Sequence, residues 1–409
     1  KYNLEANGTI PTYIDDGGYY PKANDNASPQ DWDLIGAGHD GGSETGIGEL
    51  ANEAAVKTYL DSYTGDWTEQ DPDNRPGGTI PFNQATAAAH IWSKKISEAV
   101  KGGYWPNALS RAVFGGGRTP TTQDTIDYVT ISSTGDAADF GDLTTATHVR
   151  GPVSSFTRGI WGGGETSPRA FIDYVTIMTT GNAADFGDLS VGRYAPSGMS
   201  NATRGVWAAG YGPGFETTID YVQMASLGDA TDFGDSTQAR TYVGGGSSPT
   251  RGLTEGGLTP SLVNTIDHIE IASTGNAQDF GDLIGALDGR GGGAASSTRL
   301  LTSGGSSPAY TSTIELVTMA STGNASDFGD ITAARARLGS TSSSTRGLFG
   351  GGYNPSSPGG TNIIDYVAIA TTGDAVDFGD LTLARDSISA VSNAHGGLNE
   401  GNQGVVDTT

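Results

Sequence analysis

Apolar residues in the last three-quarters of the chain occur in short runs that are rich in β-branched and aromatic side chains. Glycine, serine and threonine separate these runs. A typical run is residues 126–131 (Ile-Asp-Tyr-Val-Thr-Ile), and a typical separator is residues 134–136 (Thr-Gly-Asp). Short β-branched runs bounded by turn residues are typical of strands. The pattern therefore predicts a mainly β fold over residues 111–409.

Residues 1–110 follow a different pattern, because two segments place apolar side chains at helical spacing. Residues 48–63 carry such a stripe on Leu50, Ala54, Val56, Leu60 and Tyr63. In the second segment Asn83 suits the N-cap position and Gly102 suits the residue just past the end of the helix. We therefore predict two helices in an N-terminal region.

The β region is a tandem repeat marked by the string Asp-Phe-Gly-Asp. The phenylalanines of its six copies are Phe140, Phe186, Phe233, Phe280, Phe328 and Phe378, at a period of about 47 residues. Each copy contains four strand-sized pieces, which is the size of one propeller blade. The repeat predicts a six-bladed β-propeller. A seventh blade, completed by the N-terminal part, remains open as an alternative.

The order of the pieces in one repeat is regular. A Thr-Arg-Gly strand runs into glycines and is followed by Ile-Asp-Tyr-Val, by Asp-Phe-Gly-Asp-Leu and by a stretch rich in Ser, Thr and Ala. Lack of a Cβ permits close backbone approach, so we expect the glycine runs on the innermost strands. Residues 395–398 (His-Gly-Gly-Leu) resemble a decayed Thr-Arg-Gly strand, which predicts that the tail closes blade one.

Composition marks a boundary between the two regions. All six lysines and four of the six tryptophans lie within the first 110 residues. The formal net charge of −24 argues against nucleic acid and against anionic membrane surfaces as partners, since both attract clustered Lys and Arg. No run of about 18 apolar residues exists, so membrane insertion is not expected.

The repeated acids suggest two kinds of chemistry. Asp136, Asp139 and Asp142 offer carboxylate oxygens at the close spacing of a calcium site, although other copies carry Asn at the first position. The alternative that we favour is structural: the aspartates cap turns and pair with periodic arginines. The aspartates are Asp139, Asp185, Asp232, Asp279, Asp327 and Asp377, and the arginines include Arg158, Arg204, Arg251 and Arg346.

Catalytic signatures are weak throughout. The five histidines show no paired metal-ligand spacing, and no glycine run is followed by the Lys-Ser/Thr of a phosphate loop. A propeller glycosidase or lyase would need a pair of carboxylates on non-equivalent blades, whereas every conspicuous acid here is repeated. We therefore expect a protein that is not an enzyme and that uses no cofactor.

Candidate binding residues lie where the copies differ. The loops after the Thr-Arg-Gly strands vary in length and carry Tyr211, Phe215, Tyr310 and Tyr353. Insertions in repeat proteins commonly gather on one binding face, and exposed aromatic rings suit carbohydrate or protein contacts. The alternative is that these loops are solvated connectors without a function of their own.

The glycine-ended strand followed by a tyrosine-bearing strand is similar to kelch-type propellers, although the regular Trp of kelch repeats is missing. The whole unit resembles the tandem repeat of virion structural and tail-fibre-like proteins of marine bacteriophages, cyanophages among them. The resemblance covers about residues 111–400. It implies a virion or extracellular protein within an oligomeric assembly, attached to other virion proteins through residues 1–110. The propeller would then bind a host-surface glycan or protein. The alternative is a bacterial cell-surface or secreted adhesin.

Overall fold

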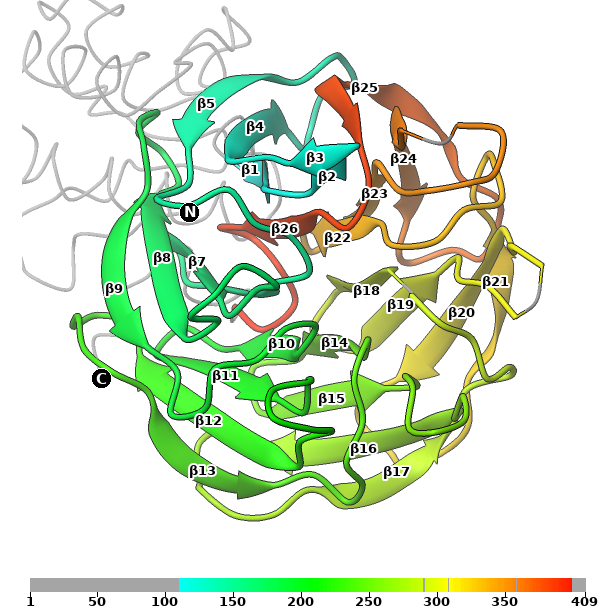
Figure 1. Ribbon diagram of the computed structural model, residues 1–409. Coiled ribbons are helices and arrows are strands. Elements are labelled where there is room, and N and C mark those ends of the chain that lie inside the picture. The colour runs from blue at the N-terminus through cyan, green and yellow to red at the C-terminus, as the bar shows by residue number, and fades with distance from the viewer. Residues whose placement is uncertain (1–109, 290, 308, 358, 399–409) are drawn as a thin grey trace, which may run out of the picture. The chain divides into compact units, whose positions relative to one another are not determined.

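The computed structural model describes residues 110–398 apart from residues 290, 308 and 358. These residues form six four-stranded antiparallel sheets arranged around a central axis, and one additional two-stranded hairpin (Figure 1). The predicted six-bladed β-propeller is confirmed. The described region contains no helix. The two helices predicted in residues 1–110 lie outside the described residues.

Each blade has an inner strand next to the axis, followed outward by a second, a third and an outer strand. In that order, blade one contains β26 (Ser389–Ser392), β1 (Arg111–Gly115), β4 (Thr125–Thr130) and β5 (Ala138–Asp142). Blade two contains β6 (Gly151–Ser154), β7 (Arg158–Gly162), β8 (Phe171–Thr176) and β9 (Ala184–Asp188). Blade three contains β10 (Ser197–Ser200), β11 (Arg204–Ala208), β12 (Thr218–Gln223) and β13 (Thr231–Asp235).

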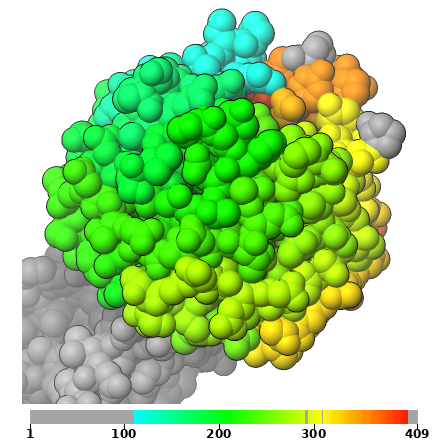
Figure 2. Space-filling view, turned by 60° about the horizontal axis from the view of Figure 1, so that its bottom comes forward, coloured from blue at the N-terminus to red at the C-terminus, as the bar shows by residue number. Residues whose placement is uncertain are grey.

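The remaining blades follow in chain order around the axis (Figure 2). Blade four contains β14 (Gly244–Ser247), β15 (Arg251–Glu255), β16 (Thr265–Glu270) and β17 (Gln278–Asp282). Blade five contains β18 (Gly291–Ala295), β19 (Arg299–Ser303), β20 (Thr313–Thr318) and β21 (Ser326–Asp330). Blade six contains β22 (Gly339–Ser342), β23 (Arg346–Gly350), β24 (Thr361–Ala368) and β25 (Val376–Arg385). The extra hairpin joins β2 (Arg118–Thr119) to β3 (Thr121–Thr122).

The inner strands come from the Ser-rich piece of the repeat, and the Thr-Arg-Gly piece forms the second strand. The expectation that the glycine runs occupy the innermost strands is therefore wrong for most of them, because they end the second strands. Gly116 shows the reason: its φ is +67°, and a Cβ there would lie 2.6 Å from the Thr147 carbonyl oxygen. Only the runs at residues 244–246 and 291–293 lie on described inner strands.

The chain closes into a ring through its C-terminal part, as predicted. Strand β26 pairs with β1, with Val113 opposite Val391 (Figure 1). The closing strand is residues 389–392 rather than residues 395–398, which form turns instead. The Asn393 side chain then accepts a hydrogen bond from the Arg111 backbone N–H. In blade two, the Ser155 hydroxyl accepts the equivalent hydrogen bond from the Arg158 backbone N–H. Blade one, whose strands come from both ends of the repeat region, therefore has the same turn bond as a blade formed by one continuous segment.

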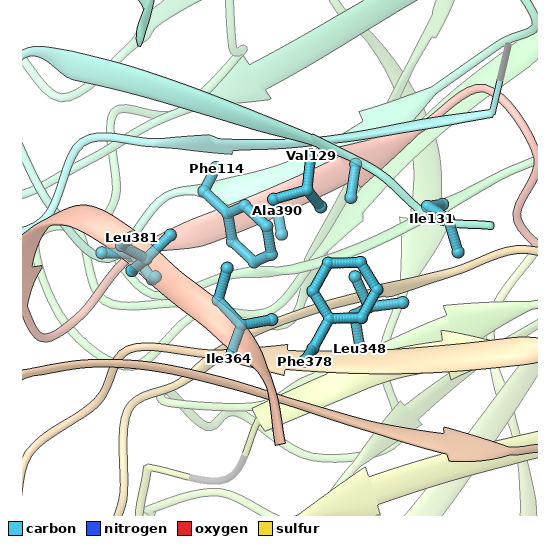
Figure 3. Packing of buried hydrophobic residues seen from close by; sticks show 10 residues of the cluster. Phe114, Val129, Ile131, Leu348, Ile364, Phe378, Leu381 and Ala390 are labelled. Atoms are coloured by element: carbon cyan, nitrogen blue, oxygen red, sulfur yellow. The ribbon is translucent and has the colours of Figure 1, made fainter. Parts of the chain in front are cut away.

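The hydrophobic core lies between adjacent blades. Where blade six meets blade one, Phe114, Ile131, Leu348 and Phe378 pack together (Figure 3). The phenylalanine of each Asp-Phe-Gly-Asp copy points into such an interface, and Phe140 is only 2% exposed. A single sheet would leave one of its apolar faces in water, whereas a closed ring of sheets buries both.

The rest of the Asp-Phe-Gly-Asp motif joins neighbouring blades at the outer rim. The Gly181 and Ala183 N–H groups of blade two donate to the carbonyls of Phe140 and Asp142 in blade one. In return, the Asp142 N–H donates to Oδ1 of Asn182. The same bond recurs with Asp229, Asn276, Asn324, Asp374 and Asp136 as acceptors. Asn and Asp alternate at this position because the bond needs only an Oδ1 acceptor.

The prediction that these rim aspartates pair with the repeat arginines is wrong, because other aspartates form the ion pairs. The aspartates that form buried ion pairs belong to the Ile-Asp-Tyr-Val strands. These pairs join Arg150 to Asp173, Arg193 to Asp220, Arg240 to Asp267, Arg335 to Asp365 and Arg385 to Asp127. Burial disfavours a lone charge, so each fully enclosed arginine needs a carboxylate partner. The first acids of the rim motif, such as Asp139 and Asp185, are exposed instead.

The arginines of the Thr-Arg-Gly turns have another role. Arg158 lies over the Tyr174 ring at 5.0 Å and donates to the Met224 carbonyl of the next blade. Arg204 and Arg346 likewise lie over a tyrosine ring of their own blade and donate a hydrogen bond to a backbone carbonyl of the next blade. Arg251 reaches the Met319 carbonyl and pairs with Glu270 on its own blade. These arginines therefore link successive blades through backbone carbonyls rather than through carboxylates.

Serines line the middle of the channel and join the inner strands. The Ser200 hydroxyl donates to the Ser154 carbonyl and accepts from the Ser154 N–H. Ser342 makes the same two bonds to Ala295. Blade five carries Ala295 where the other blades carry serine, so the ring of hydroxyls is interrupted there.

Candidate functional site at the channel mouth

The variable loops and one end of the channel share a face of the propeller. Each inner strand begins beside the end of the second strand, as in the pairing of Gly151 with Gly162. The loops between the second and third strands therefore project from the end at which the inner strands begin, which we call the channel mouth. A cavity of about 90 Å³ opens there.

Six residues at equivalent positions, one before each inner strand, line this cavity. We call them the mouth ring: Val149, Ala195, Tyr242, Gly289, Arg337 and Ser387. All six have left-handed backbone conformations, with φ between +51° and +65°. Backbone bonds connect neighbouring members, since the Ser387 N–H donates to the Arg337 carbonyl and the Val149 N–H to the Ser387 carbonyl.

Only glycine adopts this conformation without cost, and Gly289 is the only glycine of the ring. A β-branched or bulky residue at positive φ costs on the order of 1 kcal/mol or more, and such outliers gather at functional sites. The strands behind the ring repeat closely from blade to blade, whereas the ring carries six different residue types. The mouth ring is therefore the candidate site.

Aromatic side chains extend from the ring over blade three. Tyr242 contacts Tyr194, with ring centroids 5.9 Å apart, and Tyr194 contacts Tyr211 at 5.5 Å. Phe215 lies at 5.2 Å from Tyr211. The structure thus brings the predicted residues Tyr211 and Phe215 together and connects them to two tyrosines that the sequence interpretation did not single out.

The other two predicted binding residues form a separate group. Tyr310 of blade five and Tyr353 of blade six lie 5.8 Å apart by ring centroids. Both are half-buried on the variable loops of this face. Ala336, which precedes the ring residue Arg337, bridges by backbone hydrogen bonds to Tyr353, and this anchors the second group beside the mouth.

Two polar pairs lie beside the mouth, one at blade one and one at blade two. The His148 Nε2 atom is 2.6 Å from a carboxylate oxygen of Glu165, and Arg118 pairs with Asp386 at 3.2 Å. Asp386 also accepts a hydrogen bond from the Ser387 hydroxyl. Burial lowers the pKa of His148 and outweighs the opposing influence of Glu165, so the imidazole is neutral at pH 7.

Tyrosine ionisation is disfavoured at the mouth. Burial raises the pKa of Tyr242, and the neighbouring Tyr194 adds to this effect. Burial likewise raises the pKa of Tyr194, with Glu165 as the next contribution. Both phenols therefore stay protonated at neutral pH.

The C-terminal residues reach the channel from the opposite end. His395 lies below a second, smaller cavity, and its Nε2 atom is 2.9 Å from the Ser154 carbonyl oxygen. Its Nδ1 atom accepts a hydrogen bond from the Gly397 N–H. Burial lowers the pKa of His395 to about 4. Both ring nitrogens of the neutral imidazole are thereby satisfied, which fastens the chain end to the inner strands.

The three aspartates considered for calcium do not come together. Asp136 faces blade six, where its Oδ1 accepts the Asp380 N–H, whereas the Asp142 N–H bonds to Asn182 of blade two. Asp139 lies opposite Asp127 in the ladder. Within the described part of the chain, no group of three or more His, Asp or Glu side chains has the arrangement of a metal site.

The sequence interpretation missed Tyr194, Tyr242 and Arg337, although a signal for them exists. Val149 follows Phe140 of the rim motif by nine residues, and each other ring residue follows its own phenylalanine by the same distance. In repeats aligned on the phenylalanines, six different residue types occupy this position and five occupy the position before it. A hypervariable pair of positions within a regular repeat was therefore visible in the sequence.

Neither a protein-family model nor a curated protein matches the chain. Over the described residues, no helix has the length and apolar character needed to cross a bilayer. The fold and the geometry of the mouth are therefore the basis for a functional conclusion.

Proposed function

We propose that this chain is a non-enzymatic binding protein whose propeller recognises a glycan or a protein at the mouth ring and the adjoining aromatic loops. One observation carries the proposal. The scaffold positions repeat in chemistry from blade to blade, whereas the ring positions carry six different side chains in a conformation that favours glycine. Strain that persists on a rigid frame at a cavity indicates a functional surface.

Binding fits the mouth better than catalysis does. Three acids flank the ring: Glu165 and Asp386 are held by His148 and Arg118, and Asp288 directly precedes Gly289. The repeated acids are used within the scaffold, either in buried ion pairs or at the outer rim. The aromatic surface formed by Tyr194, Tyr211 and Tyr242 provides rings of the kind that stack on sugars or on apolar side chains of a partner.

The wider setting that we propose is a virion appendage, such as a tail fibre or a capsid decoration. The repeat's resemblance to phage virion proteins supports this setting. Residues 1–110 would attach the chain to other virion proteins, and the propeller would face the host. Such a component copurifies with particles, and its absence from purified particles would exclude this setting.

The binding role is tested with the full chain on arrays of glycans and of host-surface proteins. We expect retention that a Tyr211→Ala and Phe215→Ala double variant weakens. Leu227→Ala is the matched control, since Leu227 is 54% exposed in a turn at the opposite end of the strands. Polysaccharides incubated with the chain should stay intact. Release of new sugar ends at a measurable rate would overturn the assignment as a non-enzyme.

A further inference from the structure

We infer that the mouth ring binds an acidic glycan, with the carboxylate of a sugar placed in the mouth cavity against Arg337. This inference rests on the proposed binding function and names the ligand class.

Arg337 is the cation of the mouth that remains available. Its side chain lines the cavity and, among the described residues, forms neither an ion pair nor a side-chain hydrogen bond. The other arginines nearby are engaged. Arg118 pairs with Asp386, and Arg150 pairs with Asp173. Arg169 donates to the Glu165 carbonyl and lies over the Tyr194 ring.

The left-handed backbone conformation of Arg337 supports this assignment. Its φ of +63° is one that glycine would adopt without strain, as Gly289 does at the same position of the preceding blade. The Arg337 side chain passes close to Gly289, because a Cβ on that glycine would lie 3.0 Å from Arg337 Cγ. The small neighbour leaves room for the long side chain, whose guanidinium can grip a carboxylate with two parallel hydrogen bonds.

The acids around Arg337 are mostly occupied. Asp386 is held by Arg118 and Ser387, and Glu165 by His148. Asp288 is the remaining acid nearby, since it raises the pKa of Tyr242 whereas Arg337 lowers it. Asp288 does not form an ion pair with Arg337 among the described residues. The guanidinium therefore has no carboxylate partner among the residues described, and a ligand can supply one.

The cavity and the tyrosines are suited to contact different parts of one ligand. A volume of about 90 Å³ holds one functional group rather than a whole ligand, since pockets that enclose small molecules measure roughly 300 Å³ or more. Tyr242 lines this cavity, and its contact with Tyr194 continues the aromatic surface outward. A carboxylate can therefore enter the cavity while its sugar ring rests on the tyrosines.

The overall acidity of the chain does not oppose this arrangement at short range. The net charge is −24, and exposed acids such as Asp139 and Asp142 lie on the outer strands. Charges separated by more than about 8 Å are largely screened at physiological salt. A ligand carboxylate in the mouth is therefore governed by Arg337 and its immediate neighbours.

The test compares tetragalacturonate with its carboxyl-reduced, neutral counterpart by titration calorimetry on the full chain. We expect the wild-type chain to bind the acidic tetramer at least roughly tenfold more tightly, as for a charge-assisted hydrogen bond. Arg337→Asn should remove this preference, and asparagine tolerates the left-handed conformation. Arg251→Gln is the control, since it removes a cation from the start of β15, the end away from the mouth.

The outcomes separate this inference from the function on which it rests. Equal binding of the two tetramers, or an acid preference that survives Arg337→Asn, overturns the assignment of the carboxylate to Arg337. If the chain then still binds neutral glycans or proteins through Tyr211 and Phe215, the proposed binding function stands. If the arrays and both tetramers show no binding, the proposed function itself fails.

Discussion

Arg385 donates a hydrogen bond of 2.8 Å to Asp127, a residue 258 positions earlier in the chain, and both side chains are fully buried. Arg385 precedes the closing strand β26, and Asp127 lies on β4 of the same blade. In blade four the equivalent residues, Arg240 and Asp267, lie in one continuous segment. The chemistry is the same in both blades, whereas in blade one the pair also holds the two ends of the ring together.

Removal of Arg385 should therefore do more than remove one ion pair. Arg385→Ala leaves Asp127 buried without its counter-charge and should lower the free energy of unfolding by about 3–5 kcal/mol. Arg240→Ala should cost a similar amount by the same mechanism. Only Arg385→Ala should also raise the hydrogen-exchange rates of β26 and β1 selectively, because these strands meet at the closure. Equal exchange profiles in the two variants would contradict this role.

The interrupted serine ring predicts opposite effects of two single changes. Ser342→Ala removes the hydroxyl that bonds both the N–H and the carbonyl of Ala295, and should lower the free energy of unfolding by about 1–3 kcal/mol. Ala295→Ser supplies the missing hydroxyl next to Ser247 and should raise it by about 1 kcal/mol. Denaturant titration of both variants measures these effects. A destabilised Ala295→Ser chain would contradict the proposed continuity of the ring.

His395 predicts a pH dependence of stability. Its pKa is about 4 in the folded chain, below the ordinary value of 6.5, because burial disfavours the charged imidazole. The unfolded chain therefore binds more protons between these two values, so stability is lost as the pH falls through this window. The loss from pH 7 to pH 5 should be about 2 kcal/mol for this group.

The measurement compares unfolding at pH 7 and pH 5 in the wild-type chain and in His395→Gln. Glutamine does not titrate, and its amide can still donate to the Ser154 carbonyl, so the pH-dependent loss should shrink by about 2 kcal/mol. His268→Tyr is the control, since it places at this position the residue found at Tyr128 and Tyr174. An unchanged loss in His395→Gln would show that His395 is not responsible.

The fold was predictable because the repeat spacing and the strand-sized pieces are local properties. The six phenylalanines gave the blade number, and the Ser-rich and Thr-Arg-Gly pieces gave the strands. The partners of the charged residues were not predictable in the same way. Arg193 and Asp220 meet only after the chain has run through β10 and β11 into β12, whereas the sequence interpretation assigned the repeat arginines to the rim aspartates.

The candidate site was predicted in part. Aromatic residues on variable loops are visible in the sequence, and Tyr211 and Phe215 do form one cluster. The mouth ring depends on backbone conformation, which residue types alone did not indicate: Val149 and Tyr242 at positive φ are unexpected for such side chains. Variation at two adjacent aligned positions was the available signal, and its meaning required the geometry.

We propose that the residue types of the mouth ring serve binding rather than stability. The most direct test measures ligand retention and the free energy of unfolding together in a Tyr242→Asn and Arg337→Asn double variant. Asparagine is suited to the left-handed conformation, so stability should be unchanged or raised by up to about 1 kcal/mol, while retention of array ligands is lost. Retained binding, or a chain that unfolds more easily, would contradict the claim.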